Sequence, residues 1–156
     1  MKKFFLVLIL FITSCGYQPL YSTKGSEEFK FSKITLDGDI GINTKIINLL
    51  NIKEVDTDLS LNELELESLF TIEETSKDSK GKVISYRSRA EVNLVIKKNK
   101  KIVKNKDFVE DFTYSNYENK SDLIEYQKEI KGNISNKIVE EITLFMNLKW
   151  LLNFMI

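Results

Sequence analysis

Few side chains in this sequence could do covalent chemistry. The chain has no histidine and a single cysteine, Cys15. Without histidine, Ser-His-Asp and Cys-His catalysis, histidine-ligated zinc or haem and a histidine pH switch are excluded, and a lone cysteine excludes an intramolecular disulfide. Asp107, Glu110 and Asp111 lack the spacing of a calcium or zinc site, and on a strand Glu110 faces away from the other two. We therefore expect a protein that is not an enzyme and needs no metal or cofactor.

Anion binding by basic side chains is the chemistry that remains. The net charge is +0, which does not suit a nucleic-acid-binding protein, but the charges are segregated along the chain. Residues 54–78 include nine acidic residues and one basic residue, whereas residues 80–106 include ten basic residues and one acidic residue. On a hairpin, such a block predicts a concentrated positive face. We predict that it binds an anion through Arg87, Arg89, Lys97, Lys98, Lys100, Lys101, Lys104 and Lys106.

Arg87 and Arg89 stand apart because every other basic residue is a lysine. Two apart on a strand, they face the same way, and a guanidinium matches a phosphate or carboxylate with two hydrogen bonds, which an ammonium cannot do. Either a ligand or an intramolecular glutamate could be their partner. A hairpin of the acidic and basic strands would set Glu67 opposite Arg89, to within two residues. The lysines that follow also fit a solvated face that protects a sheet edge.

The first fifteen residues have the pattern of an export signal. A pair of lysines precedes nine uninterrupted apolar residues, 4–12. That is far fewer than the roughly 20 residues that span a bilayer, but it fits the hydrophobic segment of a secretory signal. The sequence Ile12-Thr13-Ser14-Cys15 resembles the lipobox of bacterial lipoproteins, in which the thiol is acylated and the signal, here 1–14, is removed. Because Gly16 rather than aspartate follows, the resemblance points to the outer membrane, with the acylated Cys15 anchored in its lipid.

These residues must be positioned by a small set of elements. Residues 15–28 show no period and are predicted to be a tether. Alternating apolar residues predict strands over 29–36 (with a bulge near Ser32 and Lys33), 64–73, 84–96 and 102–114. Turns over 37–39, 77–81 and 97–101 separate them.

Two helices complete the prediction. A short helix begins at 43 or 44 and ends at 51, and a longer one is capped by Ser121 and has an isoleucine stripe at Ile130, Ile134, Ile138 and Ile142. One sheet of about four strands with both helices on one face would bury these stripes, so the fold class is α+β with the order β-α-β-β-β-α over 29–146. The apolar tail, 147–156, either continues the last helix into the core, which we expect, or exposes an apolar surface.

The start Cys15-Gly16-Tyr17-Gln18-Pro19-Leu20-Tyr21, on a domain of this topology, resembles the family of the LPS-assembly lipoprotein LptE, particularly its alphaproteobacterial forms. The resemblance implies a non-enzymatic subunit that plugs the lumen of the outer-membrane β-barrel LptD and binds lipopolysaccharide during its delivery to the outer leaflet. LptD, lipopolysaccharide and outer-membrane lipid would then be the partners, and the protein would face the periplasm or the barrel lumen. The apolar tail is not a recognised feature of that family.

A different class of function also fits the sequence: a free-standing, periplasm-facing lipoprotein that binds a small ligand or another envelope protein. Copurification separates the two alternatives. A stoichiometric barrel protein in detergent extracts would support the first, and a monomer would support the second.

Overall fold

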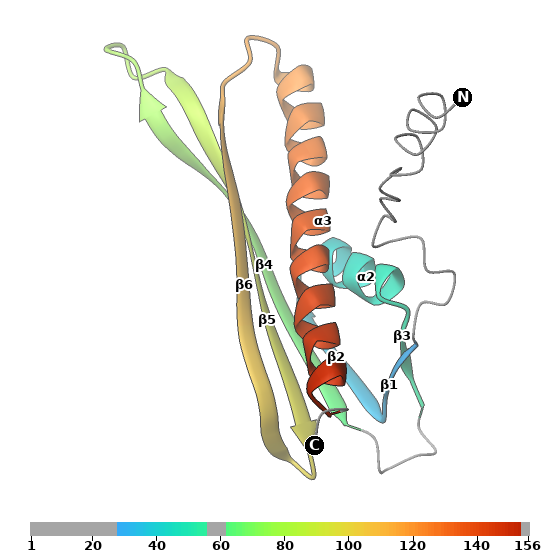
Figure 1. Cartoon of the computed structure of the whole chain (residues 1–156). Helices are drawn as coiled ribbons and strands as arrows, with labels where there is room; N and C mark the ends of the chain where they lie inside the picture. Colours follow the sequence, from blue (N-terminus) through green and yellow to red (C-terminus); the bar gives the residue numbers. More distant parts are fainter. Residues whose placement is uncertain (1–27, 56–61, 154–156) are drawn as a thin grey trace, which may run out of the picture.

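The structure is a computed structural model that describes residues 28–55 and 62–153 (Figure 1). Cys15, the predicted signal and the predicted tether therefore lie outside the described residues. The elements in chain order are β1 (Phe29–Phe31), β2 (Lys33–Gly38), α2 (Ile40–Leu49), β3 (Ile52–Glu54), β4 (Glu63–Lys77), β5 (Val83–Lys98), β6 (Lys101–Ser115) and α3 (Lys120–Asn153).

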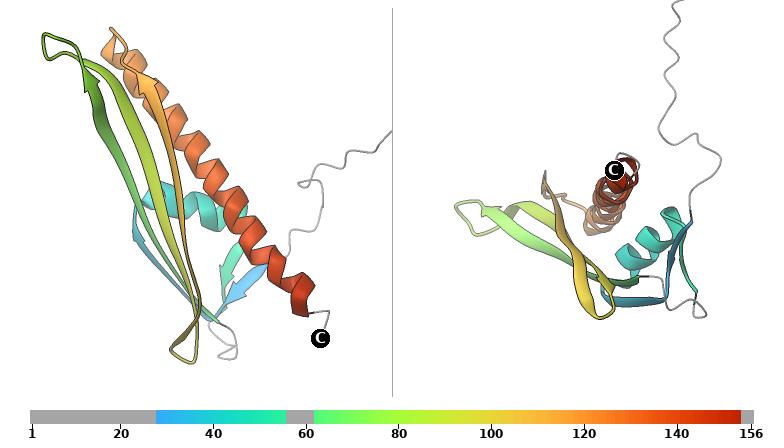
Figure 2. Two further views of the ribbon diagram at one scale, coloured as in Figure 1. Left: turned by 60° about the vertical axis from the view of Figure 1, so that its left-hand side comes forward. Right: turned by 60° about the horizontal axis from the view of Figure 1, so that its bottom comes forward.

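The main sheet has four strands in the order β2-β4-β5-β6. β2 pairs with β4 in parallel, and the other two pairings are antiparallel. Both helices lie on one face of this sheet, with α3 running along β5 and β6 (Figures 1 and 2). The α+β class and the layout of four strands and two helices are confirmed.

The predicted strand 29–36 is in fact two strands in two sheets. β1 pairs with β3 in a separate parallel pair, and β2 joins the main sheet. The expected bulge is where the chain passes between the sheets, at Ser32, whose N–H donates to the carbonyl of Asn62 (2.9 Å). The change of phase in the apolar pattern reflects this change of sheet, which buries Phe31 on one side of the break and half-buries Ile34 on the other.

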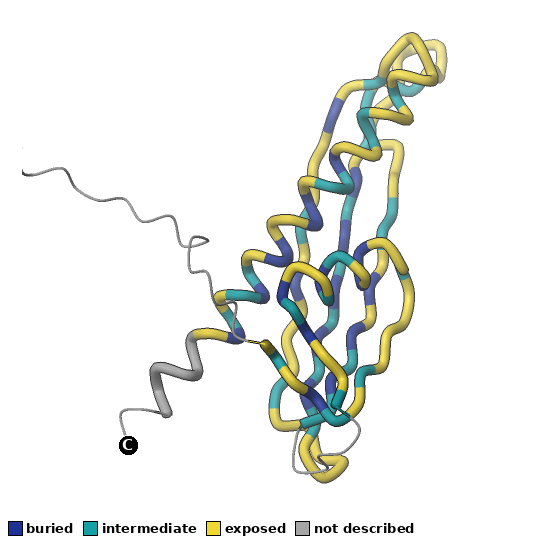
Figure 3. Tube along the Cα trace, turned by 90° about the vertical axis from the view of Figure 1, so that its right-hand side faces the viewer, coloured by how far each residue is buried: buried dark blue, intermediate teal, exposed yellow. Residues whose placement is uncertain are grey.

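The core lies between the helices and the inner face of the sheet. Buried positions alternate along the strands and recur along α3 (Figure 3), as the periods of strand and helix require. β5 contributes Ala90, Val92, Leu94 and Ile96, and α3 contributes the predicted isoleucine stripe Ile130, Ile134, Ile138 and Ile142. The predicted strands over 64–73, 84–96 and 102–114 are confirmed as β4, β5 and β6, each longer than expected.

The short helix starts earlier than predicted because its cap is Asp39 rather than Asn43 or Thr44. The Asp39 carboxylate accepts a hydrogen bond from the N–H of Ile42 (3.0 Å), which satisfies one of the free donors of the first turn. The cap of α3 is likewise Asn119, whose side-chain oxygen accepts from the N–H of Ser121 (2.9 Å), so the prediction of Ser121 as the cap is wrong. α3 continues to Asn153, so the helix does run on into the predicted tail.

Asp39 also ties α2 to α3, because its carboxylate lies 2.6 Å from the Nζ of Lys131. Partial burial raises the pKa of Asp39, but the hydrogen bond from Lys131, the N–H of Ile42 and the charge of Lys131 outweigh burial and hold the pKa below its usual value of 3.8. An acid whose pKa is lowered by folding stabilises the protein above its unfolded pKa, and this contribution is lost as the pH falls through the folded pKa.

We therefore expect Asp39→Asn to lower the free energy of unfolding by about 1 kcal/mol at pH 7. The difference from the unsubstituted protein should shrink as the pH falls below the usual pKa of 3.8 and be lost once the folded-state carboxyl is protonated. Urea unfolding over a series of pH values from 7 downward measures it. Lys131→Met removes the partner and should produce a similar pH dependence, and a difference that persists unchanged at low pH would contradict the assignment.

Candidate anion-binding site

The structure divides the predicted basic residues among three places instead of forming one positive face. Alternation along β5 and β6 sends odd-numbered and even-numbered side chains to opposite faces of the sheet. Arg87, Arg89 and Lys97 lie on the outer face, away from the helices. Lys98, Lys100 and Lys101, named here the tip lysines, surround the β5–β6 turn. Lys104 and Lys106 lie on the inner face of β6.

Arg87 and Arg89 share the outer face, as predicted, but the glutamate that pairs with Arg89 is not on β4. Arg89 Nε lies 2.6 Å from Oε1 of Glu91 on its own strand, so an intramolecular glutamate partner is confirmed for Arg89. The Cα register sets Arg89 opposite Thr71, and the expected pairing with Glu67 is wrong by four residues.

The turn between β4 and β5 explains the error in register. The hairpin closes where the N–H of Asp78 donates to the carbonyl of Lys82 (2.9 Å), and the Asp78 carboxylate accepts from the N–H groups of Lys80 and Lys82 (2.8 and 2.9 Å). A turn fixed by an aspartate in this way sets the register of the whole hairpin. Irregularities after Glu74 and Ser76 also shift the pairing near the turn.

The three tip lysines are all exposed. The turn places Asn99 and Lys100 at positive φ (50° and 63°), the backbone of a tight hairpin turn. Among the described residues, no carboxylate lies within ion-pair distance of Lys98, Lys100 or Lys101. Lys97, next to them, differs, because its Nζ contacts Glu65 at 2.5 Å. Cations without a carboxylate partner stay available for an external anion.

Lys104 and Lys106 pack their ammonium groups against aromatic rings at the same end of the sheet. The Nζ of Lys104 lies 5.2 Å from the centroid of Phe145, and that of Lys106 lies 4.7 Å from Phe108 and 5.3 Å from Phe145. Such contacts hold a cation at a surface without neutralising it. Phe145, from α3, is the site residue that the sequence analysis missed, and its position one turn beyond the isoleucine stripe was the available signal.

The arginines are remote from this lysine group. Arg89 is nine residues from Lys98 along β5, which corresponds to roughly 30 Å at the usual rise of a strand. One bound anionic group therefore does not contact both sets. The structure brings the lysines of the β5–β6 hairpin together at one end of the sheet and leaves the arginines halfway along its outer face.

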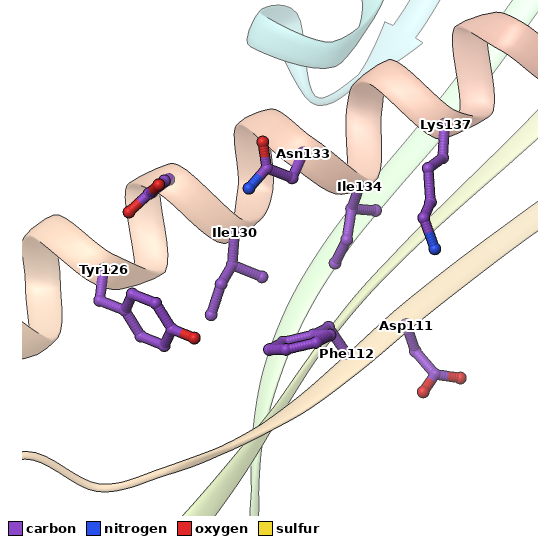
Figure 4. Close-up of a pocket in the computed structure, with 8 residues that line it drawn as sticks. Asp111, Phe112, Tyr126, Ile130, Asn133, Ile134 and Lys137 are labelled. Atoms are coloured by element: carbon purple, nitrogen blue, oxygen red, sulfur yellow. The ribbon is translucent and has the colours of Figure 1, made fainter.

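A pocket of about 320 Å³ lies between α3 and β6 (Figure 4). The apolar side chains Phe112, Tyr126, Ile130 and Ile134 meet there, with Asp111 and Lys137 at one side. Lys137 Nζ is 3.5 Å from Oε2 of Glu110. The pocket thus lies beside β6, one of the two edge strands of the main sheet, and has charges of both signs around an apolar floor.

Within residues 28–55 and 62–153, no group of three or more His, Cys, Asp or Glu side chains could hold a metal ion. Asp107 and Asp111 face one side of the sheet and Glu110 the other, as the alternation predicts. None of the helices in the described part of the chain is long and apolar enough to cross a membrane.

Comparisons by sequence find nothing: no protein-family model matches the chain, and no curated protein matches it significantly. Comparison of structures does find matches. Rare lipoprotein B from Shewanella oneidensis has a TM-score of 0.51 at 13% identity, over 78% of this chain and 96% of the other. Lipoprotein B from Nitrosomonas europaea gives 0.55 at 9% identity (74% and 81%), and a minor lipoprotein from Acinetobacter baumannii gives 0.54 at 11% identity (74% and 90%).

The chain therefore has the fold of a group of small bacterial lipoproteins. Rare lipoprotein B is among these structural neighbours, and the shared fold spans most of both chains.

Proposed function

We propose that this protein is an outer-membrane lipoprotein of the LptE type, which plugs the LptD β-barrel and binds lipopolysaccharide during its assembly at the outer membrane. The observation that carries the proposal is the combination of a lipobox cysteine at residue 15 with a domain that folds like known bacterial lipoproteins. The resemblance of the segment 15–21 to the LptE family adds to it. The protein works by binding rather than by turnover.

Shape and charge support a role inside a barrel. The domain is long and narrow, with α3 lying lengthwise along the sheet (Figures 1 and 2), and the lumen of a large outer-membrane barrel is polar. The outer face of the sheet carries exposed charged side chains, including Glu67, Arg87 and Asp107, which suit a polar wall. The tip lysines, grouped at one end, suit the phosphates and acidic sugars of lipopolysaccharide.

Purification of the lipidated protein from its own membranes tests the assembly. A β-barrel protein of LptD size should copurify in a one-to-one ratio in mild detergent, identified by mass spectrometry. Recovery of the lipoprotein alone, under conditions that keep other barrel complexes intact, would favour a free-standing lipoprotein instead.

Charge reversal of the tip lysines tests the ligand. The triple variant Lys98→Glu, Lys100→Glu, Lys101→Glu should lower the affinity for purified lipopolysaccharide by about tenfold or more, because three cations become anions facing the phosphates. Equilibrium binding of labelled lipopolysaccharide measures the change. Lys80→Glu with Lys82→Glu, at the other end of the sheet, is the control and should bind almost normally.

The arginines need a variant of their own. Arg87→Glu with Arg89→Glu should weaken binding less than the triple variant does, because Glu91 already engages Arg89. No change at all in this variant would show that the arginines do not belong to the site, and no change in the triple variant would contradict lipopolysaccharide binding at the β5–β6 end.

A further inference from the structure

β6 is one of the two edge strands of the main sheet, and its free edge is unevenly protected. Among the described residues, no strand pairs with the side of β6 that faces away from β5. Natural sheets protect such edges with lysines, bulges and prolines. The half of β6 next to the turn contains Lys104 and Lys106, and the register shifts beside it, between Ile96 and Lys97 of β5. Residues 107–115 contain neither lysine nor proline, so this half of the edge is open to another strand.

The free backbone groups of the open half belong to odd-numbered residues. The N–H of Asn116 donates to the carbonyl of Ile84 (2.6 Å), so the even-numbered residues that continue this ladder direct their backbone groups toward β5. The odd-numbered residues from 107 to 113 consequently direct their N–H and C=O groups away from the sheet, in one row. The backbone of another extended chain matches such a row of donors and acceptors.

The pocket between α3 and β6 lies next to this row. Phe112 lines the pocket and is 47% exposed, and α3 supplies Tyr126, Ile130 and Ile134 (Figure 4). In a strand added to β6, the residue opposite Phe112 would point to the inner face, because directly paired residues share a face of the sheet. Its side chain would therefore enter the pocket. Backbone pairing at a sheet edge, with a pocket for a side chain, is a recurring mode of peptide recognition.

The charges of the open half indicate the chemistry of the occupant. Asp107 and Asp111 are exposed on the outer face, and no basic side chain among the described residues lies within ion-pair distance of either. Glu110 differs, because it faces inward and lies 3.5 Å from Lys137. A strand that fits this edge therefore has basic residues opposite the two aspartates and a neutral residue opposite Glu110.

We propose that an extended segment of the partner barrel protein adds to β6 as a fifth, antiparallel strand. Read against β6 from Phe112 back to Asp107, the segment has the order apolar, basic, neutral, β-branched, neutral, basic. The apolar residue fills the pocket, and the β-branched residue lies against Val109, which is 43% exposed. A second copy of β6 does not fit, because none of its odd-numbered residues from 103 to 113 is basic.

This site is compatible with a one-to-one complex and leaves the tip lysines free. The identity of the partner as the barrel rests on the proposed function, whereas the preference of the edge for this kind of segment does not.

A synthetic peptide tests the preference. The labelled peptide Thr-Leu-Lys-Ser-Val-Ser-Lys has the expected order and should bind the lipidated protein in detergent with a Kd of about 100 micromolar or tighter, measured by fluorescence anisotropy. The peptide Thr-Lys-Leu-Ser-Val-Lys-Ser has the same composition but moves its leucine and its lysines to the opposite faces, and it should bind about tenfold more weakly. Methylation of the valine nitrogen, which faces β6, should abolish binding, whereas methylation of the first serine nitrogen, which faces solvent, should have little effect.

A charge exchange tests the register. Asp107→Lys with Asp111→Lys should weaken binding of the first peptide about tenfold or more, and the same peptide with glutamate in place of both lysines should bind this variant to within about threefold of the original affinity. Glu63→Lys with Glu73→Lys, on β4, makes the same change of charge away from the edge and should leave peptide binding almost unchanged.

A photoreactive benzophenone side chain in place of Phe112 identifies the occupant. Illumination of the lipidated protein in its own membranes should link residue 112 to one segment of the barrel protein with the expected order, located by mass spectrometry. Copurification of the barrel without this adduct would overturn the inference and leave the proposed function standing. Peptide binding without a copurifying barrel would support the edge site and contradict the proposed function. Equal binding of the two peptides, or an adduct between two copies of this chain, would also overturn the inference.

Discussion

Gly38→Ala is expected to cost about 3 kcal/mol or more of the free energy of unfolding. Gly38 ends β2 with φ of 83°, in the left-handed region that glycine adopts without strain. A Cβ atom there would lie 1.8 Å from the carbonyl oxygen of Ser68 on β4. That oxygen accepts the N–H of Asp39 (2.9 Å), so it cannot move away without breaking the entry to α2.

Gly81→Ala provides the matched control for this prediction. Gly81 has nearly the same φ, 81°, but an added Cβ would meet nothing within 4 Å. It should therefore show the backbone cost alone, about 1 kcal/mol. Urea unfolding followed by circular dichroism measures both variants. Equal losses would mean that the close approach to Ser68 adds nothing to the backbone cost and would contradict the prediction.

Cys15→Ser is expected to move nearly all of the protein from the membrane fraction to the soluble fraction. Each CH₂ of an acyl chain buried in lipid contributes about 0.8 kcal/mol, so two or three chains anchor a lipoprotein stably, and a hydroxyl at residue 15 cannot replace the thiol as their acceptor. Membrane fractionation with quantitative immunoblotting measures the change, and mass spectrometry of the unsubstituted protein should find acyl chains on residue 15.

Two controls separate anchoring from folding. Gly16→Ala leaves the thiol in place and should keep the protein on the membrane. The Cys15→Ser protein should unfold at the same urea concentration as the unsubstituted chain after signal removal, because the described core is formed by residues beyond 28. Membrane retention of Cys15→Ser, with no acyl mass on the original protein, would contradict both the lipoprotein assignment and the address it implies.

Local sequence patterns predicted the parts of the fold that depend on neighbouring residues. Alternation at Ala90, Val92 and Leu94 fixed the inner face of β5, because side chains on a strand alternate regardless of partner. The four-residue spacing of the isoleucines in α3 identified its buried stripe, because residues four apart lie on the same face of a helix. The helix starts were less predictable. Several residues near each start could cap the helix, and contacts elsewhere in the fold decide which one does. Asp39 caps α2 through the N–H of Ile42, and the ion pair with Lys131 on α3 holds its carboxylate there.

The candidate site shows where local pattern stops being informative. The sequence groups ten basic residues in one segment, but a hairpin divides such a segment between two faces and two ends. Which lysines share a surface therefore depends on where the turns close. The register of β4 on β5 was set by the Asp78 turn, and it moved Arg89 four residues from the expected glutamate.

By itself, the sequence supplied the resemblance of residues 12–15 to a lipobox, the absence of histidine and the α+β class, since each follows from residue identity or short-range period. Only the tertiary structure decided that residues 29–36 serve two sheets, that the lysines gather at the β5–β6 end without the arginines, and that β2 and β6 are the edge strands of the main sheet. Strand order, register and sheet membership depend on pairings between residues far apart in the chain, which local periodicity does not encode.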